Sequence, residues 1–274
     1  MYHRPYHVYD GLTIPSHITH LHIRENFDNI SIPSHITNVI YGDFFNQPID
    51  HLHDGVVGVY FSYGSKYNQH INIPHGVTII HFSKTYNQPL YLPSSVQNVF
   101  FGNSYNQPTV LPPSIKYVFF GYSYNQPVDL PIGIKEIIFG DHYNQPTILP
   151  MGIKSVTFGR HYNQPVDLPI TIKNVIFGHN FNQNVILPHG IMGIEFGREY
   201  TCDIYIPDYI CIFVHVDHNR DYSEQLLDKY DLVYCNYRSE KIDQRVNINK
   251  HNKFSKCLSM MNVFQDQHEL TVDS

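Results

Sequence analysis

The chain has 274 residues, of which 42% are hydrophobic and only 15% are charged, and its formal net charge is -6. This composition is too apolar for a disordered chain, and the net charge provides no global positive field that would attract nucleic acid or anionic lipid. The first twelve residues lack the apolar segment of a signal peptide, and no apolar run reaches the ~18 residues of a membrane span. We therefore expect a folded intracellular protein, in the cytoplasm (that of the host cell if it is viral), with neither nucleic acid nor membrane as a partner.

One short unit repeats from about residue 14 to residue 216, with a constant step of 19 residues from Tyr67 onward. Each unit begins with an aromatic residue followed by Asn-Gln and usually Pro. A Leu-Pro or Ile-Pro pair begins six residues after the aromatic residue, and an apolar segment that usually ends in Gly follows. A typical copy consists of Tyr124-Asn125-Gln126-Pro127, Leu130-Pro131, and the residues Ile134, Ile137, Phe139 and Gly140.

The apolar segment of each unit predicts a short β-strand. Its Val-x-Phe core alternates with period two and is rich in β-branched and aromatic residues, which is typical of a strand with one buried face. The closing glycine permits a turn with positive φ. Two prolines and a glycine in a typical unit leave no stretch long enough for a helix.

A strand this short cannot bury its own apolar face, whereas parallel strands from successive units can, at about 4.8 Å per rung. The sequence therefore predicts a mainly β protein, a parallel β-solenoid of about ten or eleven rungs. Equivalent side chains then lie above one another in columns. The asparagine column forms a structural ladder in which each amide can satisfy backbone groups of its own rung and the next. Its members are Asn46, Asn68, Asn87, Asn106, Asn125, Asn144, Asn163 and Asn182.

The i, i+3, i+5 apolar spacing resembles the Leu-x-x-Leu-x-Leu core of leucine-rich repeats. The fuller pattern resembles the FNIP repeat, a leucine-rich-repeat relative found in slime moulds and giant DNA viruses, and is clearest in Phe45-Asn46-Gln47-Pro48, Leu130-Pro131 and Phe139-Gly140. The resemblance covers residues 14–216 and implies a leucine-rich-repeat-like solenoid. FNIP proteins often carry an N-terminal F-box. Only about 13 residues precede the first unit here, so we expect none.

The outward positions of the strands, between the buried residues, form a row that is unusually apolar for a surface facing solvent. Exposed apolar patches often mark partner sites, so we take this row as a candidate binding surface. The alternatives are that β-propensity and shallow packing explain the row, or that a terminal segment covers it. The candidate residues of the row are Tyr60, Phe100, Phe119, Ile138 and Ile176.

A column of lysines runs beside this row and suits an acidic partner. Like charges one rung apart repel each other, so we do not expect the column to stabilise the fold. The alternative is a solvated face that resists aggregation. The column consists of Lys116, Lys135, Lys154 and Lys173.

No residue set has the spacing of a catalytic or metal site, so we expect no enzyme activity, no cofactor and no metal. Asp129 and Asp167 occupy equivalent places two rungs apart, about 10 Å, which would suit a pair of glycosidase carboxylates. Repeat drift explains them better, because the rung between carries Ile148. His215, Asp217 and His218 lack the spacing of an established zinc site. The histidines His142 and His161 lie in adjacent rungs and are expected to be neutral surface residues.

The repeat ends near residue 216, and residues 217–274 have a more polar composition without Pro or Gly. We expect residues 1–216 to form the solenoid, a small mixed segment from 217 to about 240 to cap its last rung, and the tail from Glu240 to be polar. The cysteines Cys202, Cys211, Cys235 and Cys257 form no CxxC pair and are expected to be free thiols.

These features favour a non-catalytic protein-interaction scaffold that presents the strand face to a protein partner. A glycan-binding or carbohydrate-active solenoid is one alternative, because β-solenoids can host such activities. A structural protein without a specific partner is another.

Overall fold

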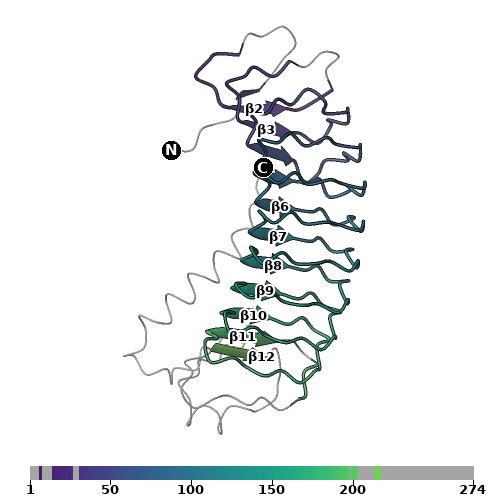
Figure 1. Ribbon diagram of the computed structural model, residues 1–274. Helices are drawn as coiled ribbons and strands as arrows, with labels where there is room; N and C mark the ends of the chain where they lie inside the picture. Colours follow the sequence, from purple (N-terminus) through teal and green to yellow (C-terminus); the bar gives the residue numbers. More distant parts are fainter. Residues whose placement is uncertain (1–5, 8–13, 27–30, 198, 203–212, 217–274) are drawn as a thin grey trace, which may run out of the picture.

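The computed structural model of the chain is a single stack of parallel strands (Figure 1). It describes residues 6–7, 14–26, 31–197, 199–202 and 213–216. In these ranges every regular element is a β-strand, and the twelve strands form one sheet in the order of the sequence. The same ranges contain no helix long and apolar enough to cross a membrane.

The strands are two to four residues long, and all neighbours are parallel. Strands β2 to β12 belong to the predicted repeat, which confirms the parallel β-solenoid, and β1 precedes it. The strands are β1 (Tyr6–His7), β2 (His20–Ile23), β3 (Asn38–Tyr41), β4 (Gly58–Phe61), β5 (Ile79–His81), β6 (Asn98–Phe100), β7 (Tyr117–Phe119), β8 (Glu136–Ile138), β9 (Ser155–Thr157), β10 (Asn174–Ile176), β11 (Gly193–Phe196) and β12 (Phe213–Val216).

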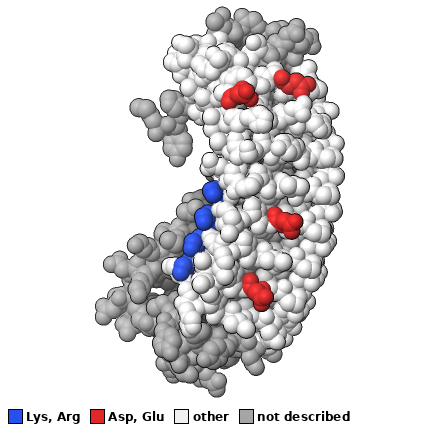
Figure 2. Space-filling view, viewed as in Figure 1, with Lys and Arg blue, Asp and Glu red and all other residues white. Residues whose placement is uncertain are grey.

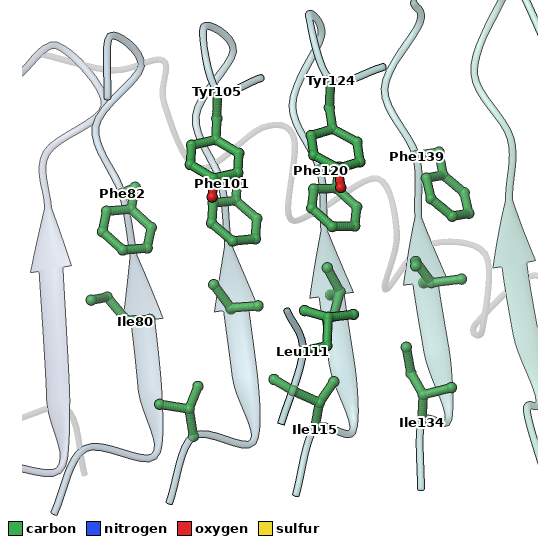
Figure 3. Close-up of a cluster of buried hydrophobic side chains, with 14 of the residues drawn as sticks. Ile80, Phe82, Phe101, Tyr105, Leu111, Ile115, Phe120, Tyr124, Ile134 and Phe139 are labelled. Carbon is green, nitrogen blue, oxygen red and sulfur yellow. The ribbon is translucent and has the colours of Figure 1, made fainter. Parts of the chain in front are cut away.

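The core is built from columns of equivalent side chains, one from each rung (Figure 3). In the rung of β7, Val118 and Phe120 are fully buried, whereas Phe119 between them is half-buried, as the period-two pattern predicts. The ring of Phe120 stacks on that of Tyr124 with centroids 3.8 Å apart, and lies 5.9 Å from the ring of Phe139 in the next rung. Two parallel columns of rings therefore run through the solenoid.

The glycine that closes most strands is required for close packing of rungs, and it does not adopt the positive φ that glycine permits. Arg24, Ser62 and Ser83 stand at this place after β2, β4 and β5. The positive φ recorded among the described glycines belongs to Gly152, at 103°, which lies in the turn after Leu-Pro. A Cβ atom at Gly140 would lie 2.0 Å from the carbonyl oxygen of Gly121 in the preceding rung. The strand ends approach each other so closely that only hydrogen fits at this place.

The predicted boundary near residue 216 and the cap and tail over 217–274 lie outside the described residues. The same holds for Cys211, Cys235 and Cys257. Cys202 is described and is a half-buried free thiol.

Candidate functional site

The outward row of the strands, here called the strand face, is brought together by the register of the sheet. Phe100 pairs with Phe119, Phe119 with Ile138, and Ile176 follows after Thr157. Tyr60 joins the same row through β4 and β5. All of these side chains are half-buried. The row is thus continuous along the molecule, and its members shield one another from solvent.

Aromatic rings make up the strand face from β4 to β7. The ring centroids lie 5.1 Å apart for Tyr60 and His81, 3.8 Å apart for His81 and Phe100, and 4.9 Å apart for Phe100 and Tyr117. Burial lowers the pKa of His81 to about 4, so this imidazole is neutral near pH 7. Tyr117 widens the aromatic surface, because it lies two residues before Phe119 on the same face of β7. Sequence reasoning missed it because it considered only the column of Phe119.

The four lysines form a column at the N-terminal ends of strands β7 to β10, along one side of the sheet (Figure 2). Each ammonium group donates a hydrogen bond to a backbone carbonyl in the turn of the next rung. Sequence reasoning considered only the repulsion between the lysines and missed these bonds, which tie successive rungs together. The donor–acceptor distances are 3.4 Å for Lys116 and Gly133, 3.4 Å for Lys135 and Gly152, 3.3 Å for Lys154 and Thr171, and 2.7 Å for Lys173 and Gly190.

A carboxylate, Glu136, lies on the outward side of β8 between Tyr117 and Ser155. It is half-buried, and burial raises its pKa. Its Oε1 atom is buried and has no hydrogen-bond partner. A buried carboxylate oxygen without a hydrogen-bond donor is an uncommon and unfavourable arrangement.

A second apolar column, here called the turn column, lies in the turns that follow the Leu-Pro pairs. It consists of Ile132, Met151 and Ile170, whose side chains are 77%, 58% and 73% exposed. Sequence reasoning missed this column, although its signal is visible as an apolar residue directly after Pro131, Pro150 and Pro169.

The asparagines of the predicted ladder stack in the order of the rungs, at the surface of the solenoid. The side-chain oxygen of Asn106 accepts a hydrogen bond of 2.9 Å from the backbone N–H of Asn125, and that of Asn125 accepts one of 3.0 Å from Asn144. The same bond links Asn68 to Asn87, Asn87 to Asn106, Asn144 to Asn163, and Asn163 to Asn182. For Asn46 a longer contact of 3.5 Å joins its side-chain oxygen to the Gln69 amide. These bonds join the turn that carries each asparagine to the same turn of the next rung.

The remaining polar candidates lie apart. Asp129 and Asp167 are exposed on the return segments, and Ile148 in the rung between them is 90% exposed. The rings of His142 and His161 lie 5.6 Å apart. Within the described ranges no three metal-ligating side chains lie together. The side chain of His215, with Asp217 and His218, falls outside them.

Comparison with known proteins identifies the repeat. The family model described as the FNIP Repeat matches residues 67–104, 105–142, 124–161 and 143–180, and each match spans two rungs. The chain is also similar to a solved structure described as "The crystal structure of CroV588 a novel circular LRR protein structure", with a TM-score of 0.54 and 25% sequence identity. The similarity covers 81% of this chain and 43% of that one, so this chain spans less than half the length of that protein. No curated protein matches the sequence.

Proposed function

Because this chain is an FNIP-repeat protein with a leucine-rich-repeat-like solenoid, we propose that it is a non-catalytic scaffold whose strand face binds a protein partner. A repeat solenoid is consistent with an interaction role, because equivalent positions of successive rungs build one extended surface. The proposed contact residues are Tyr60, Phe100, Phe119, Ile138 and Ile176 of the strand face, with Lys116, Lys135, Lys154 and Lys173 of the lysine column.

The observation that carries this proposal is the alignment of Phe100, Phe119 and Ile138 on three adjacent strands. The buried face of the sheet already supplies the core, so the fold does not require large apolar side chains on the opposite face. Aromatic residues at the surface are enriched in protein interfaces, where they supply contact area at low entropic cost.

The test is affinity purification of the tagged full chain from its native cells. We expect the double variant Phe119→Glu/Ile138→Glu to lose a partner that the unchanged protein retains. The matched control is Val110→Glu, which places a charge at a side chain that is 86% exposed on a return segment. If the double variant is folded, as judged by its thermal unfolding, and keeps every partner, the strand face is not the binding surface.

A further inference from the structure

We propose that the edge formed by the lysine column and the turn column is a second binding surface, which takes an extended peptide with alternating carboxylate and apolar side chains. The inference rests on the proposed function in one respect, namely that the partner is a protein. The two surfaces share the lysine column, and this one adds the turn column, which lies in the return segments and is not part of the strand face.

The lysine column lies against the turns that carry the turn column. The carbonyl groups that accept hydrogen bonds from Lys116 and Lys135 belong to Gly133 and Gly152, the residues directly after Ile132 and Met151. The Lys116 ammonium lies so near Gly133 that a Cβ atom built on this glycine would be 3.2 Å from Nζ. Lys116, Lys135 and Lys154 therefore each lie against a turn that carries an exposed apolar side chain. The turn beside Lys173 carries His189 instead.

The exposure of the turn column is unusual because it recurs on three successive rungs. A single exposed isoleucine on a protein surface is ordinary and needs no explanation. Here Ile132, Met151 and Ile170 follow one another at the spacing of the strands, about 4.8 Å. They form an apolar stripe along the edge, and burying that stripe against a partner is favourable.

The lysine column supplies the charge for an anionic partner. The other basic residues in the described ranges are Arg24, Lys66, Lys84 and Arg160, so half of the formal positive charge there stands in this one column. Within the same ranges no ion pair joins the four lysines to a carboxylate. Figure 2 shows them as a row, with the acidic side chains on that face lying apart from it.

Tethering prepares the lysines for binding. An ammonium group has three hydrogen-bond donors, and one of them is used by the carbonyl of the next rung. The bond is short at Lys173, at 2.7 Å, and longer at the other three lysines, at 3.3–3.4 Å. The side-chain entropy saved when a carboxylate binds is therefore largest at Lys173. A row of carboxylates also relieves the repulsion between ammonium groups one rung apart.

The dimensions of the edge match a short extended peptide. Three rung steps from Lys116 to Lys173 cover about 14 Å, which about five residues of extended chain span at ~3.3 Å each. Side chains of such a chain alternate in direction, so two or three carboxylates face the lysines while the apolar side chains face the turn column. A nucleic acid would satisfy the charges and leave the apolar stripe exposed.

The direct test uses a fluorescein-labelled eight-residue peptide of alternating glutamate and leucine, with binding to the full chain followed by fluorescence anisotropy. We expect the affinity to fall with salt, and to fall on the order of tenfold in Lys135→Gln/Lys154→Gln and in Ile132→Ser/Ile170→Ser. The matched control Lys66→Gln/Lys84→Gln removes the same charge elsewhere and should bind like the unchanged protein. Thermal unfolding of each variant verifies that it is folded.

Several results would overturn the inference. An alternating lysine–leucine or glutamate–serine peptide that binds as tightly would remove the requirement for charge or for apolar side chains. Edge variants that bind like the control would remove the surface itself. Competition by polyuridylate at equal strength would assign the lysines to phosphate instead. The two proposals can be told apart. If Phe119→Glu/Ile138→Glu loses the cellular partner while the edge variants still bind the peptide normally, the proposed function stands and this inference alone is rejected.

Discussion

Tyrosine side chains inside the solenoid differ in whether their hydroxyl groups find a hydrogen-bond partner. The hydroxyl of Tyr105 lies 2.9 Å from that of Thr109, and the Tyr143 hydroxyl lies 2.8 Å from that of Thr147. The hydroxyl of Tyr86 is buried without a partner. At the column position of Thr109, threonine and valine alternate over four rungs, up to the rung after Thr147. Those valines are Val128 and Val166.

The effect of removing a hydroxyl should therefore depend on the rung. We expect Tyr105→Phe to lower the free energy of unfolding by about 1 kcal/mol, because it breaks a buried hydrogen bond. Tyr86→Phe removes a buried hydroxyl that has no partner, and should leave stability unchanged or raise it. Denaturant titrations of the two variants provide the comparison. Equal destabilisation by both would show that the Thr109 bond contributes nothing.

His81 should make the stability of the protein depend on pH. Its folded-state pKa of about 4 lies below the ordinary value of 6.5, so protonation favours the unfolded chain. The stability is complete above pH 6.5 and is lost progressively as the pH falls toward 4. Between pH 7 and pH 5 we expect the unchanged protein to lose about 2 kcal/mol more than His81→Asn, which does not titrate. Parallel pH dependences of the two proteins would contradict the assignment.

At the scale of the rung, the sequence predicted the burial pattern of the strand but not the reason for the glycine that follows it. The period-two pattern around Val118 fixes which side chains point inward, because the solenoid has one buried face. The glycine after most strands has two possible explanations, positive φ or close approach, and one sequence does not distinguish them. The distance between Gly140 and Gly121 selects the second.

The close approach predicts a large cost for a single methyl group. In Gly140→Ala the new Cβ would lie 2.0 Å from a backbone oxygen, so neighbouring rungs must separate. We expect the free energy of unfolding to fall by about 3 kcal/mol, as for other overpacked or strained sites. Gly193→Ala is the matched control, since its nearest neighbour is the Asn174 side chain at 3.1 Å, which can move. Thermal unfolding should separate the two variants clearly, and similar melting temperatures would be inconsistent with this packing.

At the scale of the whole molecule, each strand in the described part of the chain contacts only the strands before and after it. The 19-residue step made this architecture predictable, because the repeat dictates which side chains stack. The candidate surfaces were harder to predict, since outward positions carry no folding constraint. The half-burial of Phe119 and the lysine bonds to the next rung depend on three-dimensional neighbours. The exposed turn column was visible as a pattern after each Leu-Pro pair, but nothing in that pattern placed it beside the lysines.

Nearest-neighbour stacking predicts that whole rungs are interchangeable. Deleting residues 124–161 joins Ser123 to Tyr162, removes two rungs and keeps every column in register. It also places Val166 after Thr109, so the interior alternation survives. We expect this variant to fold, with its denaturant m-value reduced by about a fifth, because the surface exposed on unfolding scales with the number of rungs. Deleting residues 124–166 instead leaves one rung without its aromatic residue and asparagine, and this rung is too short to close. The 124–166 deletion should therefore lose cooperative unfolding. The stacking of equivalent rungs would be contradicted if the 124–166 deletion unfolded cooperatively while the 124–161 deletion failed to fold.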